Sequence, residues 1–268
     1  MARTALKNVV RLINSVNKEL PIEQQFLADL KRSIELQDMK NSRMPSQTYK
    51  PSSMQCIRNM YYQVTGHPQD ATESNYTLVG ICNSGSDIHQ RIQQSVLDMK
   101  SNDIDCEYIN VADYVRERNL EDLEIVKEPD FEHGEYETKL YHKKYNISFL
   151  CDGIIRYKGK YYILELKTEN SNKFMMRQGV DHKHYHQGTA YSLMFGISDV
   201  VFVYISRDVL DMKSYLFTPT DDMKADLVGT ITTCDSYVEQ KKTPPRPENI
   251  DKRVCTYCAY RETCKMEE

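Results

Sequence analysis

The chain has 268 residues, of which 40% are hydrophobic and 28% are charged, and its formal net charge is −4. This composition is typical of globular proteins, and the length allows one sizeable α/β domain or two small ones. No apolar run reaches the roughly eighteen residues of a membrane-spanning helix, so we expect no membrane partner. A negative net charge argues against a surface coated in basic side chains, although a basic groove for nucleic acid can lie on an acidic body.

Cysteine usage indicates the compartment. The chain has eight cysteines, and its basic N-terminus lacks the apolar core and cleavage site of a secretory signal. In a reducing compartment such thiols are free, catalytic or metal-bound rather than bridged. We therefore expect a cytoplasmic protein.

The N-terminal part of the chain is predicted to be helical. Apolar residues at helical spacing over residues 4–38 predict two helices with a break near Pro21. A polar linker that contains prolines follows at residues 41–53. We expect residues 1–48 to form an N-terminal helical region and residues 49–268 to form the main domain.

Two further helices carry candidate functional residues. The first is expected to begin at Ser52 or Ser53, which are suited to cap a helix, and to carry Cys56 in its first turns. The second is expected to start near Ser86 and to carry His89. Its buried stripe consists of Ile88, Ile92, Val96 and Met99.

From residue 135 the apolar pattern changes to a period of two, which is typical of strands. Three successive antiparallel strands are predicted at residues 135–141, 146–157 and 160–168. The pattern continues with a helix over 182–195, a buried strand over 199–206, an edge strand over 214–218 and a helix over 220–240. This order predicts an α/β fold with additional helices.

The segment CDGIIRYKGKYYILELKT, residues 151–168, is predicted to form a tight β-hairpin. A two-residue turn at Lys158 and Gly159 would fix the pairing, and counting outward from it places Asp152 directly opposite Glu165. Opposed side chains in such a pair have Cβ atoms about 4.5–5.5 Å apart, so two facing carboxylates repel each other. The hairpin therefore needs a compensating cation.

Lys167 is one source of that positive charge. It lies two residues after Glu165 and so projects from the same face, whereas Leu164 and Leu166 point the other way, into the expected core. Lys167 alone balances the two carboxylates only in part, and a hard divalent cation such as Mg²⁺ or Mn²⁺ would complete the balance. The hairpin by itself leaves open the alternative of a salt bridge between Lys167 and one carboxylate on a solvated face.

The spacing of these residues resembles the signature of the PD-(D/E)xK nucleases, although Cys151 stands where that signature has proline. The resemblance implies a restriction-endonuclease-like core, with a mixed central sheet flanked by helices. It also implies that Asp152, Glu165 and the carbonyl group of Leu166 bind the catalytic metal. Lys167 would then orient or activate the attacking water and stabilise charge.

Two outlying features of that family occur in the expected order. His89, on a helix upstream, would be a further metal ligand, and Gln187 and Tyr191 would contact the DNA backbone or support the lysine. Gln187 and Tyr191 are four residues apart, hence on one helix face. Each has a plainer alternative, since His89 could be a partly buried histidine and the other two could simply pack their helix. The nearby histidines, expected to form a mildly basic solvated face, are His182, His184 and His186.

The C-terminal tail contains Cys255, Cys258 and Cys264 in a C-x2-C-x5-C arrangement. Three thiolates at this spacing can bind one soft metal centre, and spacing alone does not identify a fourth ligand. The RecB-like nucleases with an iron–sulfur cluster, such as AddB and the CRISPR-associated exonucleases, resemble this pattern and imply Cys56 as the fourth ligand of a [4Fe-4S] cluster. Zinc and free thiols are the alternatives. The cysteines expected to be buried and inert are Cys82, Cys106 and Cys234.

The leading hypothesis is a metal-dependent deoxyribonuclease, an exonuclease that prefers single-stranded or end-bearing DNA. Such an enzyme would act in recombination, repair, replication or CRISPR-type DNA processing in a bacterial, archaeal or phage-infected cell. Protein partners from such complexes and a homo-oligomer are compatible with this interpretation. The alternatives are a non-catalytic DNA-binding or scaffold subunit of a nuclease complex, and a zinc-stabilised fold that acts on another substrate.

Overall fold

The computed structural model describes residues 21–41, 46–70, 75–248 and 250–267. The chain divides into two compact units, residues 1–43 with 73–82, and residues 44–72 with 83–268. The helix expected before Pro21 lies outside the described residues.

The smaller unit contains helix α2 (Ile22–Asn41) and the first turns of helix α4 (Tyr76–Asp98). The two helices touch through Tyr76, whose backbone N–H donates to Oε1 of Glu35 at 3.1 Å. Helix α4 begins well before Ser86, so the predicted start was wrong. Gly80 and Gly85 lie in its N-terminal turns. Because glycine has a low helix propensity, these two residues made the start of the helix hard to predict from the sequence.

The larger unit is built on two sheets. The five-stranded sheet has the order β1-β5-β6-β7-β8, in which only β6 and β7 run parallel to each other. The three-stranded sheet has the order β2-β3-β4 and is antiparallel. The strands are β1 (Cys106–Ile109), β2 (Leu123–Lys127), β3 (Thr138–His142), β4 (Ile147–Cys151), β5 (Gly153–Tyr157), β6 (Lys160–Glu169), β7 (Val200–Ser206) and β8 (Met212–Phe217).

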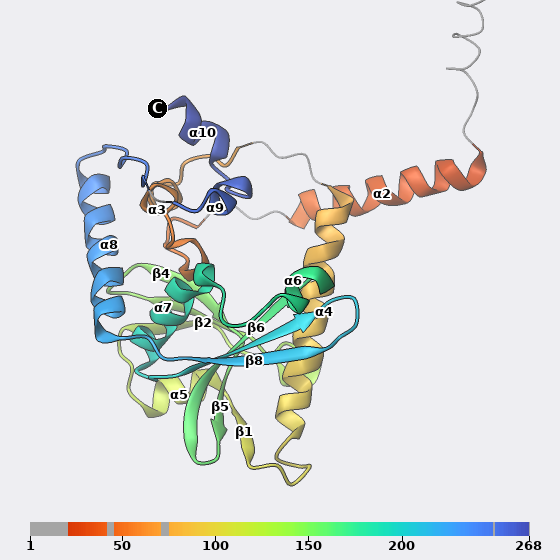
Figure 1. Cartoon of the computed structure of the whole chain (residues 1–268), viewed down its shortest axis with the longest axis vertical. Coiled ribbons are helices and arrows are strands. Elements are labelled where there is room, and N and C mark those ends of the chain that lie inside the picture. The colour runs from red at the N-terminus through yellow and green to blue at the C-terminus, as the bar shows by residue number, and fades with distance from the viewer. Residues whose placement is uncertain (1–20, 42–45, 71–74, 249, 268) are drawn as a thin grey trace, which may run out of the picture. The chain divides into compact units, whose positions relative to one another are not determined.

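Helices cover both faces of the five-stranded sheet. Ile163 of β6 belongs to a core that includes Ala190 of helix α7, whereas Leu164 and Leu166 face a second core against which Ile88 of α4 packs. Figure 1 shows α8 on one side of this sheet and α4 on the other. The other helices are η1 (Pro51–Ser53), α3 (Ile57–Val64), α5 (Val111–Glu117), η2 (Phe131–His133), α6 (Ser171–Met175), η3 (His182–His184), α7 (Tyr185–Phe195), α8 (Asp221–Glu239), α9 (Lys252–Thr256) and α10 (Arg261–Met266). The predicted α/β class, with a mixed central sheet flanked by helices, is confirmed.

The hairpin has the predicted turn and register. Lys158 and Gly159 both have positive φ, at 49° and 79°, as a type I′ two-residue turn requires. The β5–β6 pairing runs from the turn to Gly153 opposite Leu164. This register, continued outward by one position, aligns Asp152 with Glu165 as the sequence predicted, although the ladder itself ends at Gly153 and Leu164.

The strand expected over residues 146–157 is broken at Asp152. Its first half is β4, in the three-stranded sheet, and its second half is β5, in the five-stranded sheet. The carbonyl oxygen of Asp152 accepts hydrogen bonds from the side chains of Gln93 and Tyr108. The prediction of one continuous strand was therefore wrong, because this carbonyl bonds to side chains where the chain passes from one sheet to the other.

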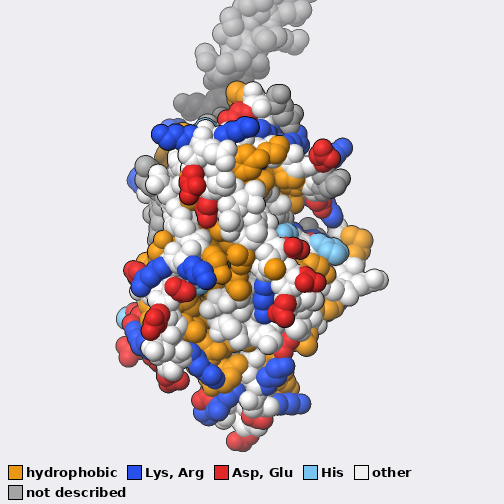
Figure 2. Space-filling view, turned by 90° about the vertical axis from the view of Figure 1, so that its left-hand side faces the viewer, with side chains coloured by type: hydrophobic (Ala, Val, Ile, Leu, Met, Phe, Trp, Pro, Cys, Tyr) orange, Lys and Arg blue, Asp and Glu red, His pale blue; other side chains and the backbone are white. Residues whose placement is uncertain are grey.

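Charge is mixed on the surface of the molecule. Among the described side chains on the face shown in Figure 2, Lys and Arg are interspersed with Asp and Glu. No described helix is both long enough and apolar enough to span a membrane.

Candidate active site

Asp152 is fixed at the junction of the two sheets by four neighbours. The residue is 6% exposed, and its Oδ2 accepts the backbone N–H of Leu166 at 2.7 Å. Its carbonyl oxygen accepts from Nε2 of Gln93 and Oη of Tyr108, each at 2.7 Å. A Cβ on Gly153 would lie 2.7 Å from the Tyr108 ring, so only glycine fits after this aspartate without displacement. The carboxylate is therefore held in one place by buried contacts.

The carbonyl group of Leu166 faces the same space as Asp152. In a strand the N–H and C=O groups of one residue point toward the same edge. The N–H of Leu166 reaches Asp152, and the β5–β6 ladder ends one pair earlier, at Gly153 and Leu164. The carbonyl oxygen of Leu166 is thus on the edge where the resemblance requires a metal ligand.

Glu165 is held by a chain of side chains. Its Oε1 accepts from Nζ of Lys167 and from Nε2 of Gln187, the latter at 2.6 Å. Gln187 also donates to Oη of Tyr191 at 2.9 Å, and Tyr191 donates to the carbonyl oxygen of Leu150 at 3.0 Å. The second carboxylate oxygen, Oε2 of Glu165, is buried and has no hydrogen-bond partner among the described residues. A buried, unpartnered carboxylate oxygen requires a cation or a water.

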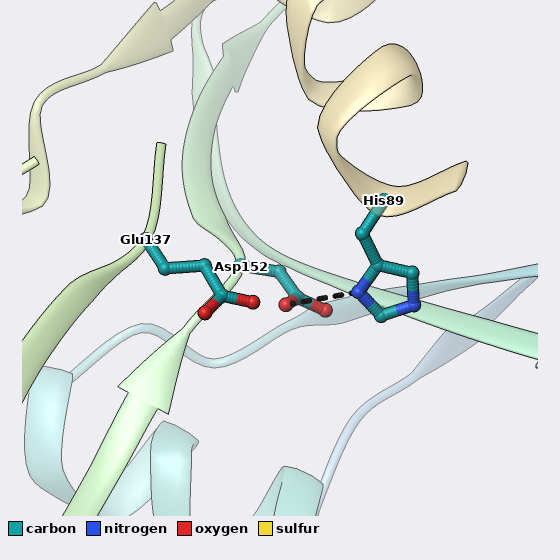
Figure 3. Close-up of side chains that lie close together, drawn as sticks. All are labelled: His89, Glu137 and Asp152. Carbon is teal, nitrogen blue, oxygen red and sulfur yellow. Dashed lines mark ion pairs between the residues drawn. The ribbon is translucent and has the colours of Figure 1, made fainter. Parts of the chain in front are cut away.

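His89 and Glu137 approach Asp152 from opposite sides (Figure 3). The ring atom Nδ1 of His89 lies 3.5 Å from Oδ1 of Asp152. One ligand atom each from His89, Glu137 and Asp152 lies within 4.8 Å of the others, a spacing compatible with a shared metal ion. Sequence analysis missed Glu137, which precedes β3 within the predicted strand 135–141. An acidic residue at a strand start is too common to single out without the fold.

The buried acidic side chains of the site shift one another's pKa. Burial, opposed by Lys167 and reinforced by Asp152, raises the pKa of Glu165 to about 7. Burial and the nearby Asp152 likewise raise the pKa of Glu137 to about 7. Burial alone would raise the pKa of Asp152, but His89 and Lys167 outweigh it and hold this pKa below its usual value. Three acidic groups thus share one site with a single lysine.

The solvated salt bridge considered from the sequence is excluded by burial, since Glu165 is only 2% exposed. The fold brings together every residue predicted for the nuclease site. Gln187 is buried and contacts Glu165, where contact with DNA or support of Lys167 had been expected. The residues brought together are His89, Asp152, Glu165, Leu166, Lys167, Gln187 and Tyr191.

The histidine tract is not a uniformly solvated basic face. Nδ1 of His184 lies 2.8 Å from Oη of Tyr204, and the ring is stacked near Phe202. Burial, together with nearby Lys167, lowers the pKa of His184 far below its usual value. This histidine is therefore neutral and half-buried, whereas His182 and His186 are exposed, as expected.

The four cysteines of the predicted cluster line one pocket of about 310 Å³. Cys56 is the N-cap of α3, so its predicted place inside the helix was wrong. No three described thiols place their sulfur atoms within 4.8 Å of one another. The pocket is also lined by five cationic side chains and by no carboxylate. Its cysteines and cations are Cys56, Cys255, Cys258, Cys264, Arg58, Arg246, Lys252, Arg261 and Lys265.

The remaining cysteines lie elsewhere in the fold. Cys106 and Cys234 are buried, as expected. Cys151 is also buried, directly before Asp152. Cys82 is exposed, so its expected burial was wrong, because it lies on the first turns of α4 within the smaller unit.

Comparisons with known proteins yield only distant likenesses. No protein-family model matches this chain, and a search of curated proteins finds no relative. The crystal structure of SSO0001 is similar at 18% identity and a TM-score of 0.44, over 91% of this chain and 96% of that chain. An alkaline exonuclease from Laribacter hongkongensis, LHK-Exo, is similar at 11% identity and a TM-score of 0.38, over 74% of this chain and 90% of its own.

The same exonuclease in complex with dAMP gives 12% identity and a TM-score of 0.38, over 73% of this chain and 89% of its own. Likenesses this weak assign no function to this chain, whose chemistry has to be inferred from the site itself.

Proposed function

We propose that this protein is a metal-dependent deoxyribonuclease that hydrolyses phosphodiester bonds at the Asp152 site. The observation that carries the proposal is the buried junction where Asp152 and Glu165 face each other beside Lys167. Glu165 also keeps one buried oxygen without a protein partner. Hard divalent cations take such oxygens and polarise phosphate groups.

Within this proposal, Asp152, Glu165, His89 and the carbonyl oxygen of Leu166 would hold Mg²⁺ or Mn²⁺. The divalent ion would polarise the phosphate and favour attack by water. Glu137 offers a further oxygen ligand beside Asp152. Gln93 and Tyr108 keep Asp152 in position through its backbone, so the ligand set is preorganised.

Lys167 would orient the attacking water and stabilise negative charge on the phosphate. Its Nζ already bonds to Glu165, so it lies at the point where a metal ligand and the phosphate would meet. Gln187 and Tyr191 fix Glu165 from behind and would act as positioning residues. A preference for single-stranded or end-bearing DNA, with exonucleolytic products, is supported by the resemblance of the signature residues to RecB-like nucleases.

The second part of the proposal concerns the cysteine pocket. Four thiols around one cavity, accompanied by five cations and no carboxylate, are compatible with a negatively charged thiolate centre. We infer that Cys56, Cys255, Cys258 and Cys264 would hold a [4Fe-4S] cluster, with zinc as the less favoured occupant. Such a centre would join the start of α3 to the tail and support the fold beside the nuclease site.

The nuclease proposal is tested with the purified full chain and DNA labelled at the 5′ or the 3′ end, single- or double-stranded, in Mn²⁺ or Mg²⁺. Wild type should shorten the DNA from an end, and Lys167→Ala should not. If wild type and Lys167→Ala leave every substrate equally intact, the protein is no nuclease. DNA binding without cleavage would then favour the non-catalytic subunit.

The cofactor proposal has its own test, which does not involve DNA. Protein purified without oxygen should be brown, absorb near about 400 nm as iron–sulfur proteins do, and contain iron and sulfide. Cys258→Ala should lose all three properties. A colourless protein that contains zinc and no iron would refute the cluster.

A further inference from the structure

Arg58 lies against the cysteine pocket and is nearly inaccessible to solvent, with 6% of its surface exposed. Its Nη1 donates to the sulfur atom of Cys264 at 3.2 Å and to the carbonyl oxygen of the same residue at 3.1 Å. Its Nε donates to the carbonyl oxygen of Pro244 at 3.1 Å. Within the described residues no carboxylate oxygen lies within ion-pair distance of this guanidinium.

A buried guanidinium without a carboxylate partner is costly, because burial removes the water that stabilised its charge. Carbonyl oxygens satisfy its N–H groups but supply no full negative charge, and the carboxylate of Glu267 acts on the guanidinium only from beyond ion-pair distance. The sulfur atom of Cys264 can supply that charge if the thiol is ionised, as it is when it binds a metal. The environment of Arg58 therefore favours an ionised sulfur at Cys264.

The rest of the pocket has the same charge bias. Four further cations line it, and the thiols are the groups in its lining that become anionic on metal binding. Arg58 differs from those cations in being buried, whereas Arg246 is exposed and its Nη2 lies 3.9 Å from the sulfur of Cys255. A short, buried contact is stronger than a long, exposed one, because water screens the latter.

Arg58 also connects the two ends of the ligand set. It follows the N-cap residue Cys56 by two positions on α3, and it grips Cys264, which lies about two hundred residues further along the chain, in α10. Residues beyond the metal ligands that hold a ligand by a hydrogen bond typically set its orientation and its electron density.

We propose that Arg58 is a positioning residue for the cysteine-ligated centre, where it binds the thiolate of Cys264 and offsets the negative charge of the four thiolates. This inference rests on the proposed metal-binding function of the pocket. Two consequences follow. Arg58 slows the loss of metal from the site, and it raises the reduction potential of an iron–sulfur centre, because a cation at a ligand sulfur stabilises an added electron.

The test compares three variants of the full chain, each purified without oxygen. Arg58→Gln removes the charge, Arg58→Lys keeps it, and Arg246→Gln removes an equal charge from the exposed side of the same pocket. Two quantities are measured, the rate at which a chelator such as EDTA removes metal and the reduction potential of the metal centre. Circular dichroism checks that each variant is folded.

Arg58→Gln should lose metal roughly 10-fold faster than wild type, as is usual when a residue supporting a metal ligand is removed. Its reduction potential should be more negative. Arg58→Lys should recover part of both properties, and Arg246→Gln, which loses a longer and exposed contact to Cys255, should change both properties less than Arg58→Gln does.

If Arg58→Gln and Arg246→Gln behave alike, the proposal for Arg58 is wrong while the metal site stands. If wild type holds no metal that depends on the cysteines, the proposed cofactor is wrong, and the role of Arg58 is refuted with it. If Arg58→Gln is destabilised and Arg58→Lys does not restore metal retention, Arg58 is purely structural.

Discussion

The carboxylate site and the cysteine pocket have opposite imbalances of charge. At the carboxylate site Glu137, Asp152 and Glu165 share Lys167 and His89, and one buried oxygen of Glu165 has no partner among the described residues. The described lining of the cysteine pocket has five cations, four thiols and no carboxylate, and Glu262, outside the lining, pairs with Lys265 and Arg261. The first arrangement suits a hard cation and the second suits anionic sulfur. The two sites of this chain therefore favour ligands of opposite charge.

The two sites also differ in how they are held. Asp152 and Glu165 are fixed by strands of the central sheet and by buried side chains from α4 and α7. The cysteine pocket is held by side chains that reach across long sequence separations, such as Arg58 to Cys264 and Asp70 to the N-terminus of α10. We therefore expect the carboxylate site to keep its shape without metal. The shape of the cysteine pocket should depend on these long-range hydrogen bonds and on the metal centre proposed for it.

The sharpest test of a preorganised carboxylate site is Asp152→Asn. The amide keeps an oxygen for the N–H of Leu166 and removes one negative charge. DNA cleavage should fall by roughly 100-fold or more, because a metal ligand is weakened, while the thermal midpoint should not fall. Glu107→Gln, a carboxylate on β1 outside the site, is the matched control and should cleave DNA normally. Unfolding of Asp152→Asn would mean that the carboxylate is structural.

Gly153→Ala tests whether the backbone at the sheet junction sets the position of Asp152. The new methyl group would lie 2.7 Å from the ring of Tyr108, which holds the carbonyl oxygen of Asp152. Overpacking should cost about 1–3 kcal/mol of unfolding free energy, measured by urea denaturation, and should weaken Mn²⁺ binding. Gly229→Ala on α8 meets no atom within 4 Å and should instead stabilise the protein, by up to about 1 kcal/mol. An equal effect of both substitutions would contradict the role of the junction.

The hairpin was predictable because its determinants are local. A glycine-containing turn and a period of two fix which residues face each other, and the register of Asp152 and Glu165 followed from them. The break at Asp152 was not predictable, since β4 and β5 have the same alternating pattern and differ only in the sheet they join. Glu137 and Gln93 reach the site only because the chain crosses between those sheets, and no local pattern marks such a crossing.

The cysteine pocket was likewise only partly predictable from the sequence. Spacing identified Cys255, Cys258 and Cys264 as a set, and the fold places Cys56 at the same pocket. The cationic lining comes from separate segments of the chain, so no local run of the sequence marks it. Arg58 could not be identified from its neighbours in sequence, because the sulfur atom to which it donates belongs to a residue about two hundred positions away.

Asp70→Ala tests whether long-range ties hold the cysteine pocket. The carboxylate of Asp70 accepts the backbone N–H groups of Glu262 and Thr263 at 2.6 and 3.1 Å, and so caps α10 from a distant segment. Its loss should cost about 1 kcal/mol and should speed alkylation of Cys264 in metal-free protein. Asp251→Ala removes a local cap, from α9, and is the control. If both variants alkylate Cys264 at the same rate, the distant tie has no special role.

An effect that appears only as the pH falls is expected at the rim of the carboxylate site, in His184. Burial and the cations Lys167, Lys183 and Lys173 lower the pKa of this histidine far below its usual value, and Asp181 opposes them only in part. An unfolded histidine titrates near about 6.5, so below that pH the unfolded state binds a proton that the folded state refuses. The free energy of unfolding should therefore fall as the pH falls, by up to about 1.4 kcal/mol per pH unit from this group.

His184→Asn can keep a hydrogen bond to Tyr204 and removes the titrating ring. Urea denaturation between pH 7.5 and 5.5 should show a smaller loss of stability in this variant than in wild type, with the two converging at the upper end. His182→Asn, at an exposed histidine two residues earlier, should follow the wild-type curve. Parallel curves for wild type and His184→Asn would show that His184 takes up its proton in the folded state. His184 would then be a second cation near Lys167. The carboxylate site would hold more positive charge than the comparison with the cysteine pocket assumes.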